Sequence, residues 1–205
     1  MKAARMSMKC FLTIAVLAAP LSLLRAQAIP QAIGALRYAR TLGDADTFGQ
    51  VTAAAALPGG RIAILDGMER RVTLFERTGS LMGVYERRGQ GPGEFSLPIA
   101  LALRGGNLIV LDRGNVRILE LSVVADTLAL RREIRTPIVG PSDMCSVGDR
   151  LFLLGFEGGK LIHEVDRSGK ITRSFGTPVG DDPTGGHLTA AGNLVCSPAG
   201  WVAVL

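Results

Sequence analysis

The sequence predicts an all-β fold made of repeated four-stranded antiparallel sheets. The segment LPGGRIAILD at 57–66 recurs as LRGGNLIVLD at 103–112. Repeats of about 40 to 50 residues with short apolar strands are typical of the blades of a β-propeller. Beyond the first 28 residues, no helical periodicity longer than a turn appears. We therefore expect a propeller, six-bladed when complete, of which about three blades and one further strand are present.

Repeated strands and turns set the expected blade boundaries. One apolar strand recurs after glycine-containing turns, at 61–65, 107–111, 150–154 and 201–205. Hairpins at 72–85 and around the turn at 166–170 supply two further strands in their units, and Asp126-Thr127 marks the corresponding turn in the middle unit. The expected blades are therefore 51–96, 97–142 and 143–192, with the start of a fourth at 193–205.

The two ends of the sequence carry their own expectations. An outer strand at 35–48 is expected to pair with the last blade, because joining the two ends of the chain closes the ring and removes exposed sheet edges. The last residues fall inside a strand that we interpret as the first of the fourth blade. We therefore expect a piece of a longer propeller.

The first 28 residues have the pattern of a secretory signal peptide. Lys2, Arg5 and Lys9 precede an apolar run at 11–24, and Ala-Gln-Ala at 26–28 supplies the cleavage pattern. The run is shorter than the roughly 20 residues that span a bilayer, so no permanent membrane span is expected after cleavage. An uncleaved membrane anchor is the alternative. The predicted location is extracytoplasmic, either secreted or periplasmic.

Removal of this leader changes the charge of the protein. The whole chain has a formal net charge of +5, and four of its 23 basic residues but none of its 18 acidic residues lie in the leader. The mature chain would therefore be close to neutral. A broad basic surface of the kind that binds nucleic acid is not expected.

The residues at 98–121, PIALALRGGNLIVLDRGNVRILEL, resemble an NHL repeat: proline, an apolar strand, Gly-Asn, a strand ending in Asp, Asn-x-Arg and a third strand. The link at 87–98, RRGQGPGEFSLP, is similar to the family's glycine-rich connection, which ends in Gly-x-Phe-x-x-Pro. The chain thus resembles the exported six-bladed propellers of bacteria. The pattern weakens in the third unit, where Gly155 and Lys160 replace the aspartate and the arginine. A kelch propeller is the alternative, because of the Gly-Gly doublets.

Eight repeat positions are interpreted as structural. Asp66 and Asp112 end a strand where a turn begins, and a carboxylate there can accept hydrogen bonds from backbone N–H groups. A calcium or substrate ligand is the alternative role for these two residues. The resemblance implies that Arg71 and Arg117 brace neighbouring blades. The remaining positions form the link between blades, which no helix follows as a phosphate cradle would require: Gly89, Gly91, Gly93 and Phe95.

Cys145 and Cys196 begin equivalent Cys-Ser steps in successive units. Equivalent positions of adjacent blades lie side by side near the propeller axis, and an exported protein meets oxidising conditions, so a disulfide is one alternative. Inner strands of adjacent blades are often further apart than the roughly 7 Å between Cα atoms that a disulfide spans. We therefore expect two buried free thiols.

No pattern in the sequence predicts a catalytic residue or a bound cofactor. His163 and His187 are too few for a catalytic zinc, which takes about three protein ligands. Asp181-Asp182 is too small a set for calcium by itself, and bound calcium stays open as an alternative. We expect a scaffold that binds an unidentified protein, peptide or small-molecule ligand, and no nucleic acid. The resemblance leaves a metal-dependent lactonase or peptidyl-amidating-lyase-like enzyme, with its site in the central channel, as the alternative.

Overall fold

The computed structural model describes residues 41–43, 47–178 and 192–205, all of which belong to one compact unit. The predicted leader at 1–28, the paired aspartates at 181–182 and His187 lie outside the described residues. Most of the predicted outer strand at 35–48 also lies outside them. Its described residues, 41–43 and 47–48, are not in a strand.

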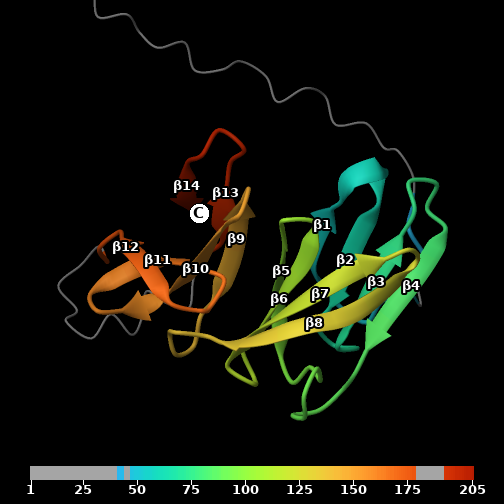
Figure 1. Ribbon diagram of the computed structural model, residues 1–205, viewed down its shortest axis with the longest axis horizontal. Coiled ribbons are helices and arrows are strands. Elements are labelled where there is room, and N and C mark those ends of the chain that lie inside the picture. Colours follow the sequence, from blue (N-terminus) through green and yellow to red (C-terminus); the bar gives the residue numbers. More distant parts are fainter. Residues whose placement is uncertain (1–40, 44–46, 179–191) are drawn as a thin grey trace, which may run out of the picture. The chain divides into compact units, whose positions relative to one another are not determined.

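The described chain forms three four-stranded sheets and one two-stranded sheet, which confirms the all-β fold (Figure 1). In every sheet the strands pair antiparallel in sequence order. A short 3-10 helix, η1 (Pro58–Gly60), lies in the first turn. The strands are β1 (Val51–Ala56), β2 (Ile62–Asp66), β3 (Arg71–Phe75) and β4 (Leu81–Glu86); β5 (Pro98–Arg104), β6 (Asn107–Asp112), β7 (Arg117–Val124) and β8 (Thr127–Arg135); β9 (Asp143–Val147), β10 (Arg150–Glu157), β11 (Lys160–Val165) and β12 (Ile171–Phe175); and β13 (Leu194–Cys196) and β14 (Val202–Val204).

The fourth unit differs from the expectation of a single first strand. The repeated apolar segment forms the second strand of every sheet, so the last copy is β14, and β13 precedes it. The sequence pattern missed β13 because it has only three residues, directly before the turn that contains Gly200. The described part of this unit therefore contains two paired strands.

Tight glycine turns join the first and second strands of the sheets. Arg104 pairs with Asn107, and Gly105 and Gly106 between them have φ of 57° and 81°. Two consecutive left-handed residues are the requirement of a type I′ hairpin turn, which glycine meets without steric cost. The third sheet also has a two-residue turn, since Val147 pairs with Arg150 around Gly148 and Asp149, but there only Gly148 has a positive φ.

Apolar cores fill the spaces between successive sheets, and β6 shows how. All six residues of β6 are buried. Leu108 and Val110 belong to the core shared with the first sheet, whereas Ile109 and Leu111 belong to the core shared with the third. A strand covered on both faces is apolar at all its central positions, which is why the repeated segment stands out in the sequence. A third core joins the third and fourth sheets.

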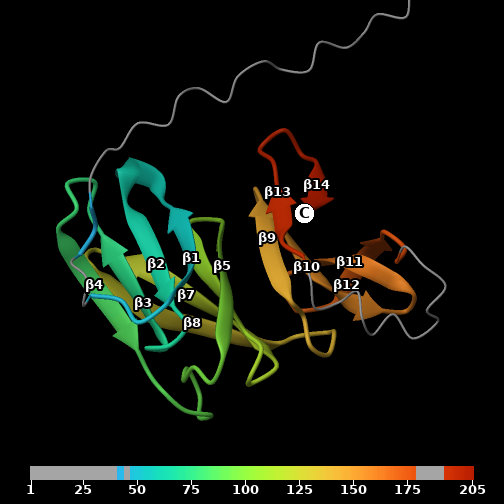
Figure 2. The same cartoon turned by 180° about the vertical axis from the view of Figure 1, so that it is seen from behind.

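The first strands of the sheets are neighbours. Strand β5 contacts β1 on one side and β9 on the other, and β9 also contacts β13 (Figures 1 and 2). In the part of the chain that the structure describes, each of these strands pairs only with the second strand of its sheet and is therefore an edge strand. The fold therefore brings four free strand edges together, from segments up to about 140 residues apart in the chain.

Candidate functional site

The first strands line a hollow of about 470 Å³, here called the inner hollow. Its lining consists of 54–56, 101–103, 144–146 and 194–196, one segment from each sheet. These side chains are alanine, leucine, valine, methionine, one serine and the two cysteines. Because each segment belongs to an edge strand, backbone N–H and C=O groups also belong to this surface. The hollow combines small apolar side chains with backbone hydrogen-bonding groups.

Two polar contacts and one covalent bond join the inner strands of the second, third and fourth sheets. The Ser146 hydroxyl donates a hydrogen bond of 2.6 Å to the carbonyl of Leu103 on β5. The Leu194 N–H donates to the Asp143 carboxylate at 2.6 Å. A disulfide joins Cys145 on β9 to Cys196 on β13.

The disulfide corrects the expectation of two free thiols. The Cα atoms of Cys145 and Cys196 are 5.6 Å apart, within the range that a disulfide spans. The prediction was wrong because it assumed that the inner strands of adjacent sheets lie too far apart for a disulfide. The usable signal was the equivalent register of both cysteines in successive repeats, in a chain predicted to be exported.

Asp66 accepts three backbone hydrogen bonds and fastens the segment before the first sheet. Its carboxylate receives the N–H groups of Gly49 at 2.8 Å, Gln50 at 3.0 Å and Glu69 at 3.0 Å. Burial by itself would raise the pKa of Asp66, but these donors and the nearby Arg71 outweigh it, and the pKa falls below 3.8. The Asp66 carboxylate thus links the segment before β1 to the turn that follows β2.

Asp112 holds the equivalent place in the second sheet. It accepts hydrogen bonds from the N–H groups of Ser96 at 3.1 Å and Leu97 at 2.8 Å, and from the Asn115 side chain at 2.7 Å. Asp66 and Asp112 are both fully buried. In the third sheet Gly155 stands instead, and a Cβ there would lie 2.8 Å from the Ile138 side chain. A side chain at that position would require the Ile138 side chain to shift.

The arginines at the repeat positions bind the links between sheets. Arg117 donates to the carbonyl of Gly91 at 2.7 Å and to that of Glu94, and it pairs with Glu133 at 2.9 Å. Arg71 donates to the carbonyl of Thr47. Both side chains therefore contact the segment that leads into their own sheet.

The glycine-rich link between the first and second sheets is held at several points. The Asn115 side chain donates to the carbonyl of Gly89 at 3.1 Å, and the N–H of Gly93 donates to Glu133. Phe95 is fully buried, with its ring centroid 5.6 Å from that of Tyr85, whose hydroxyl donates to the carbonyl of Gly93 at 2.8 Å. None of the eight repeat positions lines the inner hollow.

His163, weighed in the sequence as a metal ligand, is buried in β11. Its Nε2 lies 3.0 Å from the carbonyl of Gly155 and its Nδ1 lies 2.8 Å from the Ser174 hydroxyl. Both ring nitrogens thus have partners within the third sheet. Among the residues that the structure describes, no three histidine, cysteine, aspartate or glutamate side chains are grouped so as to hold a metal ion.

A buried charged cluster between the second and third sheets was missed by the sequence reasoning. Arg104 and Glu120 are both fully buried, with the Arg104 Nη2 atom 3.9 Å from a Glu120 carboxylate oxygen. Glu120 also contacts Arg131 at 3.3 Å, Arg132, and the Asn107 amide at 2.9 Å. Burial by itself would raise the pKa of Glu120. The three arginines lower it by more, so the pKa of Glu120 falls below its ordinary value. The pKa of Arg104 is lowered by its burial.

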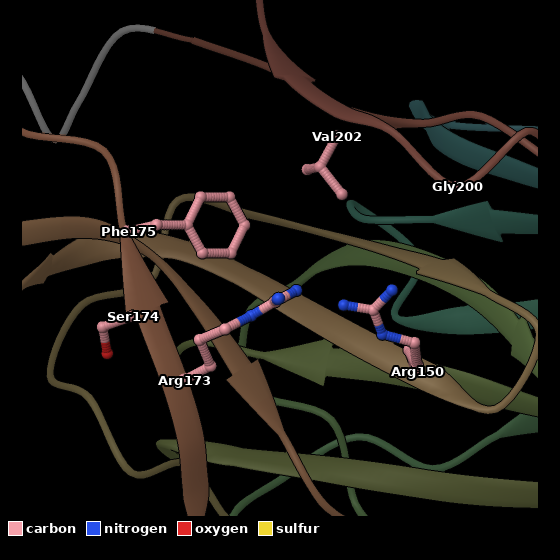
Figure 3. A pocket seen from close by; sticks show the side chains of 6 residues that line it. All are labelled: Arg150, Arg173, Ser174, Phe175, Gly200 and Val202. Carbon is pink, nitrogen blue, oxygen red and sulfur yellow. The ribbon is translucent and has the colours of Figure 1, made fainter.

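A second hollow of about 280 Å³ lies between the third and fourth sheets (Figure 3). The side chains of Arg150 and Arg173 point toward each other beside the ring of Phe175. Glu164 contacts both, with distances of 2.7 Å to Arg150 and 3.1 Å to Arg173, and Arg150 lowers the pKa of Glu164. The two guanidinium groups lie over the rings of Phe152 and Phe175 at 4.9 Å and 5.3 Å. Their charges thus have partners within the protein.

No helix among the described residues is long and apolar enough to cross a membrane.

No family model matches the chain, and no curated protein matches it. Solved structures do. A Bacteroides fragilis protein provisionally named as an exported protein has a TM-score of 0.54 and 18% identity, over 67% of this chain and 41% of that one. The WD40 repeats of RRP9 have a TM-score of 0.53 and 16% identity, over 76% and 44%. Virginiamycin B lyase of Staphylococcus aureus has a TM-score of 0.50 and 15% identity, over 76% and 55%.

At these identities the likeness concerns the fold alone. The chain spans between 41% and 55% of the length of these three structures. They are β-propellers, and the stacked antiparallel sheets with adjacent first strands have the same arrangement. The described chain therefore has a partial β-propeller fold.

Proposed function

We propose that the protein is an exported, NHL-like propeller that serves as a binding scaffold, and that the inner hollow is its binding surface. The observation that carries the proposal is the convergence of four edge strands on one hollow. Small apolar side chains offer contact area there, and free strand edges can hydrogen-bond an extended chain. A peptide or protein segment is therefore the class of ligand that the surface favours.

Three observations support export. The leader pattern at 1–28 predicts it, and the mature propeller would then span 29–205. A disulfide such as Cys145–Cys196 persists in oxidising compartments. One structural neighbour is itself named as an exported protein.

The proposal can be tested with a display library of random linear peptides selected on the mature chain. Ala54 and Ala56 line the inner hollow and are exposed, so larger residues fit there without disturbing a core. We expect Ala54→Trp and Ala56→Trp to weaken binding of the selected peptides by about tenfold or more, since each tenfold loss corresponds to about 1.4 kcal/mol. Met68→Trp is the matched control, because Met68 is exposed on a turn that does not line the hollow.

Equal binding by all three variants would contradict the inner hollow as the binding surface. The alternative function is a metal-dependent lactonase or amidating-lyase-like enzyme, which requires metal ligands facing the axis. The lining supplied by the described residues contains only one hydroxyl and a disulfide beyond its apolar side chains. Stoichiometric zinc or calcium in the purified full chain, lost together with a catalytic activity, would favour that alternative.

A further inference from the structure

The Arg104 side chain lacks the partners that a buried guanidinium requires. Its exposed fraction is 0%, and among the described residues Nε, Nη1 and Nη2 have no hydrogen-bond partner. The nearest carboxylate oxygen, on Glu120, is 3.9 Å away, beyond hydrogen-bonding distance. A buried charged group without hydrogen bonds is costly, and such groups in native proteins are satisfied by protein, water or a bound ion. Arg104 therefore lacks, among the described residues, the hydrogen bonds that a buried guanidinium normally has.

The charges around Arg104 favour an anion. Its strongest charged neighbours are Glu120 and Arg132 from the second sheet, and Asp149 and Arg167 from the third. Glu120 is shared, because it also pairs with Arg131 and Arg132. Asp149 pairs with Arg167 at 2.9 Å. The cluster therefore has more positive than negative groups. Water could satisfy the N–H donors of Arg104, but it would not balance this excess positive charge.

We propose that this cluster is a binding site for a small oxyanion, with the Arg104 guanidinium as its principal donor. The planar guanidinium presents paired N–H groups that match two oxygens of one carboxylate, phosphate or sulfate. The Asn107 amide donates a hydrogen bond of 2.9 Å to Glu120, which holds the Glu120 carboxylate within the second sheet beside Arg104. The proposal is independent of the ligand of the inner hollow.

The turns at this end of the sheets border a hollow next to Arg104, whose own side chain is not part of the lining. A hollow of about 510 Å³ is lined by Leu103 and Gly105, the two chain neighbours of Arg104, and by Gly106, Gly148 and Asp149. A Cβ at Gly105 would lie 2.8 Å from Arg167 Nη2, so the Asp149–Arg167 pair lies directly over this turn. Exposed ion pairs contribute little stability, so this one can open at small cost.

The experiment is a calorimetric titration of the mature chain with inorganic phosphate, and separately with acetate, at an ionic strength held constant with sodium chloride. We expect saturable binding of one phosphate per chain and a rise in Tm with phosphate. Arg104→Met should weaken phosphate binding by about tenfold or more. Arg104→Lys should also weaken it, because lysine keeps the charge but lacks the paired N–H donors of the guanidinium. Arg113→Met is the matched control, because Arg113 is exposed on a turn at the opposite ends of these strands.

Two further variants keep the test decisive if Arg104→Met does not fold. Asp149→Asn removes a negative charge and should tighten phosphate binding, whereas Arg167→Met should weaken it. Acetate binding with the same dependence on Arg104 would identify a carboxylate as the natural class, and phosphate binding alone would identify a phosphate or sulfate. Binding that none of these variants changes would overturn the proposal. A Tm that depends only on ionic strength would mean that water satisfies Arg104, and would overturn it as well.

Discussion

At the scale of single residues, two buried aspartates hold separate backbone segments together by accepting hydrogen bonds from both. Asp66 and Asp112 each hold the segment that enters a sheet against the turn between the second and third strands of that sheet. An aspartate at the end of an apolar strand is easily read from the sequence. Its partners are not, because Gly49 and Gln50 precede Asp66 by a whole hairpin.

The first prediction follows from Asp66. Asp66→Asn replaces one of the two acceptor oxygens with a donor that faces N–H groups, and should lower the free energy of unfolding by about 1 to 3 kcal/mol at about pH 7. The pKa of Asp66 is lowered in the folded protein, so its charge stabilises the fold above the ordinary value of 3.8. This contribution is lost as the pH falls through the lower folded pKa.

Urea unfolding of both proteins, followed at neutral and at acidic pH, measures the effect. The difference between wild type and variant should shrink only below the ordinary aspartate pKa of 3.8. Asp126→Asn, in the exposed turn between β7 and β8, serves as control and should stay within about 0.5 kcal/mol. A difference that is independent of pH would show that the carboxylate charge is not the stabilising feature.

At the scale of elements, neighbouring sheets are joined both by apolar cores and by specific bonds at their inner strands. Strand β6 serves two cores at once because its alternate residues face opposite neighbours. The bonds from Ser146, Asp143 and Cys145 then tie β9 to the strands on either side. Each sheet is thus stabilised mainly by its neighbours, as in other repeat architectures.

The disulfide gives the second prediction. Cys145 and Cys196 are 51 residues apart, and a loop of that length implies up to about 4 kcal/mol of stabilisation in the chain-entropy description. The Cys145→Ala/Cys196→Ala double variant should therefore unfold at lower urea concentration. Dithiothreitol should lower the stability of the wild type to about that of the variant. The variant itself should not respond to dithiothreitol, and two titratable thiols in the unreduced wild type would contradict the bond.

At the scale of the whole molecule, the described chain is a row of stacked sheets, and several sheets together form the proposed binding surface. No single sheet contains the inner hollow, since each supplies one edge strand to it. The Arg104 cluster is likewise shared, with Arg104 and Glu120 from the second sheet and Asp149 and Arg167 from the third. Binding at either place therefore requires correctly stacked neighbours.

The third prediction concerns the leader. When the full chain is expressed in a bacterium with an active secretory pathway, cleavage after Ala28 should leave Ile29 as the first residue. N-terminal sequencing and intact mass of the periplasmic or secreted protein measure this. Arginine substitutions within the apolar run, such as Leu17→Arg, should keep the chain uncleaved in the cytoplasm. An unchanged N-terminus in material recovered from the membrane would support the uncleaved anchor instead.

Sequence reasoning predicted the fold well and the sites only in part. The repeat predicted four-stranded sheets, the paired glycines at 105–106 predicted a tight turn, and the apolar run of β6 predicted burial on both faces. The three-residue strand β13 was too short to be recognised. Arg104 was missed because it follows the apolar residues of β5 directly and resembles the polar end of a strand.

The sequence by itself determined the order of strands and turns, because these depend on alternation and on glycines within a few residues of each other. Only the tertiary structure decided that Cys145 and Cys196 are bonded and that Arg104 is buried without protein hydrogen bonds. Both depend on how closely separate sheets approach. That distance is set by side-chain packing between segments far apart in the chain, which no local pattern records.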